Sequence, residues 1–286
     1  MNTAFNNNYS VLPFYENIEM QLRYLTYSYG AIYPLYCQKD MYPCFQLVLP
    51  SGSQQPVIMQ DGERKISLYL MDKNNNEVKL LSTSPDLHVS SLTINGETRY
   101  VIWQAGETVH TAEHYILPLG QYYIKLIDAT NDLTYYSDFI TVVDSVASYL
   151  KIEWRDYDNL IGDSAAILYK SGSLTYRNVV YLPTQLGKPE YQFDEEGETR
   201  DGHFFPTKQV SYKRYKAVFE ASEYLLDVMR LIRLSDVVIV TDPYGTQFQA
   251  DTLLITPQWT EQGDLATCTM EMTSNTVVKR CGRAIS

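Results

Sequence analysis

The sequence predicts a mainly β protein, in which an N-terminal β-sandwich is followed by an antiparallel, β-rich α+β domain with one main helix. Three observations predict this. Short segments rich in β-branched and aromatic residues follow one another up to residue 148. One amphipathic helical pattern lies near residue 225, and alternating strand patterns follow it. At 286 residues the chain is long enough for two domains, each with its own core.

Seven strands are expected in the first half, because each segment is short and turn residues separate it from the next. They span residues 45–50, 65–72, 77–82, 88–94, 97–104, 121–128 and 134–144. Asn95-Gly96 is the strongest two-residue hairpin signal among them. Gly120 and Tyr122 before an alternating strand are typical of a late-strand corner in immunoglobulin-like domains. The sequence therefore predicts an immunoglobulin-like sandwich without the Cys-Trp-Cys core of antibodies.

The main helix is expected within residues 220–236. Ser222 is a suitable N-cap, and Glu223 and Asp227 suit the positive end of the helix dipole. Arg230 and Arg233 suit its negative end. Residues at helical spacing form one apolar face, which we expect to pack on a sheet: Leu225, Val228, Met229 and Ile232.

An antiparallel meander should follow the helix. Strands are expected at 236–241, 246–255 and 265–273, with turns at 242–245 and 261–264. Cys268 falls on the apolar side of the last alternation. A core thiol is the favoured interpretation over a catalytic one, because no histidine lies near it in the sequence.

The predicted domains are residues 1–44, a Tyr-rich N-terminal arm, residues 45–148, the sandwich, and residues 149–286, the α+β domain. The first two together should fold without the third. The arm carries more tyrosines than one small core can satisfy: Tyr24, Tyr27, Tyr29, Tyr33, Tyr36 and Tyr42. They could pack on their own sandwich or form an interface with a neighbouring subunit, since aromatic residues with a polar tip are enriched at interfaces.

One segment matches a catalytic motif. His110, Glu113 and His114 spell H-x-x-E-H, the zinc-site signature of inverzincin peptidases. That site needs a helix, whereas Val109, Tyr115 and Ile116 favour a strand. In a strand the two histidines would lie about 13 Å apart, too far for one metal ion. We therefore expect no catalytic residue, no metal and no cofactor.

Residues 193–208 contain five carboxylates within eight positions, and Gly197 and Gly202 indicate a mobile loop. Such oxygens suit hard cations, but their spacing is not that of an EF-hand. A solvated acidic loop is one interpretation, and docking onto a basic surface of another subunit is the other. The C-terminal Lys279, Arg280 and Arg283 could provide such a surface.

Net charge, the N-terminal segment and the cysteines limit the classes of partner and the compartment that we expect for this protein. The net charge of −11 disfavours a duplex nucleic acid as a direct partner. The N-terminus lacks the basic and apolar segments of a signal peptide, and no apolar run is long enough for a membrane span. Cys37, Cys44, Cys268 and Cys281 fit no zinc or redox motif and are expected to be reduced thiols in a protein made in a cytoplasm.

Four sequence blocks in the second half follow one another in a characteristic order. They are "YLPTQLGKPEYQF", "EASEYLLDVMRLIRLSDVVIV", "DTLLITPQWTEQGDLATCTMEM" and "VVKR", and this order carries a resemblance. Over roughly residues 150–283, it resembles a family of virion structural proteins of tailed phages and prophages of Bacteroidota, including crAss-like phages. The resemblance implies a tail or neck component that assembles into a ring, and it implies no functional residues.

The favoured hypothesis is a structural virion protein, made in the host cytoplasm, whose partners are copies of itself and other tail or neck proteins. On this hypothesis no enzymatic activity is expected. A glycan-binding or adhesion protein is the alternative, with the immunoglobulin-like domain presenting Trp103, or with Trp154 or Trp259 as the aromatic platform. Each tryptophan lies in a strand pattern, where core packing is expected. An enzyme is a third hypothesis and would need a pocket.

Overall fold

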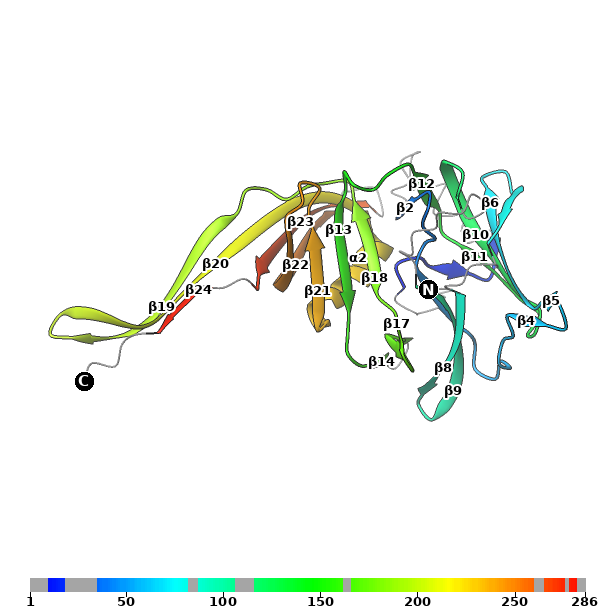
Figure 1. Ribbon diagram of the computed structural model, residues 1–286, viewed down its shortest axis with the longest axis horizontal. Helices are drawn as coiled ribbons and strands as arrows, with labels where there is room; N and C mark the ends of the chain where they lie inside the picture. Colours follow the sequence, from blue (N-terminus) through cyan, green and yellow to red (C-terminus); the bar gives the residue numbers. More distant parts are fainter. Residues whose placement is uncertain are drawn as a thin grey trace.

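A computed structural model describes residues 10–18, 35–81, 87–105, 116–161, 166–259, 265–275 and 278–281. This part of the chain is mainly β, with one short α-helix and a following 3-10 turn. Figure 1 shows the first-half sheets at one end of the molecule, the second-half sheet beside them, and a long hairpin projecting away from both.

The first half contains a larger sheet, built in the described residues from seven strands. They are β1 (Phe14–Tyr15), β2 (Leu35–Gln38), β6 (Ile66–Asp72), β7 (Glu77–Leu80), β10 (Gly120–Asp128), β11 (Leu133–Ser137) and β12 (Ile140–Val143). β10 pairs with β6 on one edge and with β11 and then β12 on the other. The strand expected at 134–144 is therefore two strands, interrupted at Asp138 and Phe139.

A smaller sheet faces it, made of β3 (Phe45–Val48), β8 (Leu87–Ile94) and β9 (Glu97–Gln104) in the order β3-β9-β8. The β8–β9 turn is the expected Asn95-Gly96, with φ of 50° and 80° at the two residues. Both sheets contribute to one core, in which Leu47 and Ile102 meet Leu68 and Ile124. Six of the seven expected segments are each found as one strand, and the seventh, 134–144, is divided between β11 and β12.

Two further contacts bear on the immunoglobulin-like assignment. The Tyr122 hydroxyl, near the start of β10, donates to the Leu119 carbonyl at 3.1 Å. Gly120 has a φ of 141°, and a Cβ there would lie 3.1 Å from that hydroxyl, so the corner requires glycine. β2 runs parallel to β12. The immunoglobulin-like assignment itself stays a prediction.

The boundary expected at residue 44 is wrong for the described part of the arm. β1 pairs with β11, and β2 pairs with β12, so both strands belong to the larger sheet of the sandwich. β1 has only two residues, which is too short a pattern to be found in the sequence.

The second half is one sheet in which the described residues form eight strands. In order they are β18 (Asn178–Leu182), β13 (Leu150–Arg155), β21 (Val237–Thr241), β22 (Gln247–Trp259), β23 (Leu265–Ser274), β20 (His203–Ser222) and β19 (Glu190–Arg200), and β24 (Val278–Cys281) also pairs with β20. The predicted antiparallel meander β21-β22-β23 is confirmed. Two-stranded ribbons complete the structure: β4 (Met59–Gln60) with β5 (Glu63–Arg64), β14 (Leu160–Ile161) with β15 (Ala166–Ile167), and β16 (Lys170–Ser171) with β17 (Leu174–Thr175).

The predicted helix is confirmed as α2 (Glu223–Met229), which continues as the 3-10 turn η2 (Arg230–Leu234). Ser222 caps it, with its hydroxyl accepting from the Leu225 amide at 3.4 Å. The expected apolar face is buried: Leu225, Val228, Met229 and Ile232 all lie in the core of the second half. Cys268 lies there too, fully buried as expected, and its burial raises the pKa of the thiol to about 11.

The two halves share a third core. The face of the small sheet that is turned away from the sandwich carries Val48, Val101 and Trp103. These side chains pack on Ile167 and Tyr169 of the second half. The small sheet is therefore buried on both faces, and the sandwich depends on residues beyond 148 to cover one of them.

Buried polar contacts join the halves at the same place. The Gln46 amide donates to the Leu168 carbonyl and accepts from the Leu168 amide at 2.9 Å. The Ser10 hydroxyl accepts from the Gln46 backbone N–H at 2.9 Å, and the Ser10 carbonyl accepts from the Tyr224 hydroxyl. Next to Ser10, Val11 packs in the second-half core, whereas Leu12 packs in the sandwich. The expectation that residues 1–148 fold alone conflicts with this seam.

Candidate functional site

The catalytic motif cannot be placed, because His110, Glu113 and His114 lie outside the described residues. Within the described ranges, no group of three or more histidine, cysteine, aspartate or glutamate side chains is arranged to hold a metal ion. No helix in these ranges is long and apolar enough to cross a membrane.

Four of the tyrosines proposed for an interface, Tyr24, Tyr27, Tyr29 and Tyr33, also lie outside the described residues. The other two contact their own chain. Tyr42 is only 2% exposed and belongs to the sandwich core, so the interface prediction is wrong for Tyr42. Tyr36 is half-buried, and its ring lies 4.6 Å from the Tyr149 ring.

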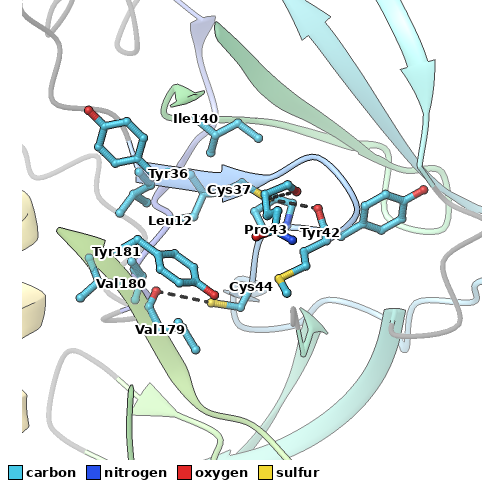
Figure 2. Close-up of a pocket in the computed structure, with 14 residues that line it drawn as sticks. Leu12, Tyr36, Cys37, Tyr42, Pro43, Cys44, Ile140, Val179, Val180 and Tyr181 are labelled. Carbon is cyan, nitrogen blue, oxygen red and sulfur yellow. Dashed lines mark hydrogen bonds between the residues drawn. The ribbon is translucent and has the colours of Figure 1, made fainter. Parts of the chain in front are cut away.

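A small cavity lies where the halves meet (Figure 2), and its volume is about 40 Å³. Leu12, Tyr36 and Cys37 line it from the first half, and Val179 and Tyr181 line it from the second. Such a volume has room for about one water molecule and is well below that of a small-molecule site.

Two cysteine thiols, those of Cys37 and Cys44, also line the cavity. The Cys37 thiol donates to the Met41 carbonyl at 3.1 Å, and burial raises its pKa far above the usual value. The Cys44 thiol lies 3.9 Å from the Val179 carbonyl across the seam. A buried thiol with a raised pKa is a poor nucleophile, so the arrangement suits packing between the halves.

The tryptophans separate into two groups. Trp103 and Trp154 are each 1% exposed, which confirms core packing for both. Trp259, the last residue of β22, is 49% exposed, so the core prediction is wrong there. Trp103 cannot serve as an aromatic platform on the surface of the sandwich, because the second half covers it.

The acidic segment is a hairpin, and the loop prediction for it is wrong. β19 and β20 pair from Glu190–Arg214 out to Arg200–His203. The turn is Asp201-Gly202, with φ of 50° and 79°, the left-handed pair that a two-residue hairpin turn requires. That Asp-Gly dipeptide, between segments of strand-forming residues, is the signal that could have revealed the hairpin.

One ion pair and one side-chain hydrogen bond cross the hairpin. The Lys208 ammonium lies 2.8 Å from the Glu196 carboxylate, and the Gln209 amide donates to the Glu195 carboxylate at 2.7 Å. All of these carboxylates, from Asp194 to Glu198, are exposed. They line a strand that, in the described structure, pairs only with β20.

The hairpin also exposes aromatic side chains. Phe193 is 70% exposed, Tyr191 is 65% exposed and Phe204 is 50% exposed. The Lys213 ammonium lies 5.9 Å from the centre of the Tyr191 ring, so the two residues share a face of the hairpin. Within the body of the second half, alternate residues of β20 point to this same face. Tyr215 is one of them, and it is buried in the core that also contains the apolar side of α2. The aromatic face is therefore the core face of the sheet, continued beyond its cover.

The basic C-terminal segment joins the same hairpin. β24 pairs antiparallel with residues 208–211 of β20. Residues 208–211 also pair with β19, so β19 and β24 lie on opposite edges of β20. Within one chain the acidic and basic segments are thus separated by one strand, and they do not contact each other as neighbouring strands.

Searches of protein-family models, curated protein sequences and solved structures found no match to this chain.

Proposed function

We propose that this protein is a structural component of a phage virion, a tail or neck subunit that assembles into a homo-oligomeric ring. The observation that carries the proposal is the projecting hairpin β19–β20 (Figure 1) and its exposed aromatic face. Three large aromatic side chains on one projecting element cost solvation free energy unless another surface covers them. The sequence resemblance of residues 150–283 supports a virion subunit as the context.

A ring suits this geometry. The hairpin reaches away from the body of its own chain (Figure 1), so a neighbouring copy could contact it with a different part of its own surface. Such a heterologous contact repeats around an axis and closes into a ring when the rotation allows. The protein would be made in the host cytoplasm and incorporated into the virion, where other tail or neck proteins are its further partners.

The test is assembly of the purified full chain, measured by mass photometry and negative-stain electron microscopy. We expect closed rings of one stoichiometry, and we expect the chain among the proteins of gradient-purified virions by mass spectrometry. Phe193→Ser with Phe204→Ser should weaken the rings, whereas Tyr244→Ser should not. Tyr244 is the matched control, because it is 78% exposed but lies at the β21–β22 turn of the body. A chain that stays monomeric and is absent from virions would contradict the proposal.

A glycan-binding protein is the second candidate, and the exposure of Trp259 is the observation that favours it. An exposed indole can stack on a sugar ring, and it would lose that contact in Trp259→Ala. Binding on a glycan array that disappears in this variant, from a chain that forms no rings, would support the alternative.

A further inference from the structure

The two edges of the projecting hairpin differ in charge. β19 carries Asp194, Glu195, Glu196 and Glu198, whereas the short strand β24 carries Lys279 and Arg280. In the described structure each of these strands pairs with β20 alone, so one edge of each has no partner strand. Unpaired edges of this kind readily pair with another chain.

The charged residues also occupy matching register positions along the hairpin. Val210 of β20 is paired with Asp194 on one side and with Lys279 on the other. The next residue, Gln209, is paired with Glu195 and with Arg280. A second copy placed beside the first, without a shift along the strands, would bring its basic edge next to the acidic edge.

The strand directions permit such a repeat. β19 and β24 both run antiparallel to β20, so they run in the same direction as each other. When copies repeat around an axis along the strands, β24 of one copy lies parallel to β19 of its neighbour. Parallel pairing is an ordinary backbone arrangement.

Charge also selects this contact over the two symmetric ones. Two β19 edges facing each other would place carboxylates against carboxylates, and two β24 edges would place cations against cations. Like charges directly opposite each other on adjacent strands are destabilising. Only the unlike pair of edges is complementary, and that pair is heterologous.

We propose that copies of this protein join edge to edge, with the β19 edge of one copy against the β24 edge of the next. The hairpins then form one continuous sheet with the repeat β24-β20-β19 around the ring. This inference rests on the proposed ring and names the surfaces that build it. It also gives the acidic segment its partner, the basic segment of the neighbouring copy.

The experiment uses charge reversal in the full chain, with assembly measured by mass photometry over a range of protein concentrations. Asp194→Lys with Glu195→Lys reverses the acidic edge, and Lys279→Glu with Arg280→Glu reverses the basic edge. We expect each pair to raise the concentration for half-assembly by about ten-fold or more, since like charges then face each other. All four changes together should restore assembly to within about three-fold of the original chain, because the edges are again complementary.

Glu77→Lys with Asp158→Lys is the matched control. It makes the same change in net charge as the acidic-edge pair, at two exposed positions away from the hairpin, and it should shift half-assembly by less than about two-fold. Far-UV circular dichroism of each variant checks that the fold is intact.

Rings that assemble equally well in the reversed variants would overturn the edge-to-edge contact while leaving the ring in place, and so would a variant with all four changes that assembles no better than either pair. An original chain that is monomeric at every concentration would overturn both the edge-to-edge contact and the proposed function.

Discussion

Gln46 offers the sharpest test of how the two halves depend on each other. Its side chain is fully buried, and its amide makes two hydrogen bonds, one to each backbone polar group of Leu168 in the second half. Gln46→Ala removes both and leaves a buried N–H and a buried C=O without their partner. Each such group costs about 1–3 kcal/mol, so we expect a loss of about 2–6 kcal/mol in the free energy of unfolding.

Urea titration followed by tryptophan fluorescence and far-UV circular dichroism measures this loss. Trp103 lies in the shared core and Trp154 in the second-half core, so fluorescence reports on both. We expect one cooperative transition by both probes, shifted to lower urea. Gln60→Ala is the control, because Gln60 is exposed, and it should change stability by less than about 0.5 kcal/mol. A loss below about 1 kcal/mol in Gln46→Ala, or two separate transitions of which only one moves, would refute the shared core.

Three further outcomes are expected. A chain ending at residue 148 should bind the dye ANS and aggregate at concentrations where the full chain does not, because it exposes the face of Val48, Val101 and Trp103; a soluble, dye-free truncated chain would contradict this. Burial raises the pKa of Asp138 to about 6, so its contribution to stability is present below about pH 4 and is lost as the pH rises through 6. Asp138→Asn should therefore gain up to about 3 kcal/mol over the original chain between pH 4 and pH 7, measured by thermal unfolding, and a difference that does not change with pH would count against it. Cys268, with its pKa raised to about 11, should resist iodoacetamide in the native protein at pH 8 and react in urea, as read by peptide mass spectrometry; rapid native labelling would contradict the burial.

The strands of the sandwich could be predicted because each presents a local pattern. β9 shows both the strength and the limit of that reasoning. Its span was predicted, but its residues from Val101 to Gln104 are all buried, with no alternation. A continuous apolar run indicates burial on both faces, so "YVIW" was a signal that another layer covers this sheet. Nothing in the run says which part of the chain supplies that layer.

The candidate site could be predicted only in part. The opposite charges of the acidic and basic segments are plain in the sequence, and the hypothesis that they meet between subunits followed from them. Their positions on two edges of β20 did not follow, because the pairing of 208–211 with 278–281 joins segments far apart in the chain. The exposure of Phe193 was hidden too, since an alternating apolar residue in a strand looks the same whether or not its face is covered.

The sequence by itself determined the elements: short strands, the capped helix with its apolar face, and the Asn95-Gly96 turn, each of which is set by neighbours within a few residues. Only the tertiary structure decided that Gln46 reaches Leu168, that Val11 and Leu12 enter different cores, and that the hairpin extends past its cover. The physical reason is range. Local patterns depend on backbone geometry and side-chain periodicity, whereas pairing between distant segments depends on which surfaces remain unburied after the local elements have formed.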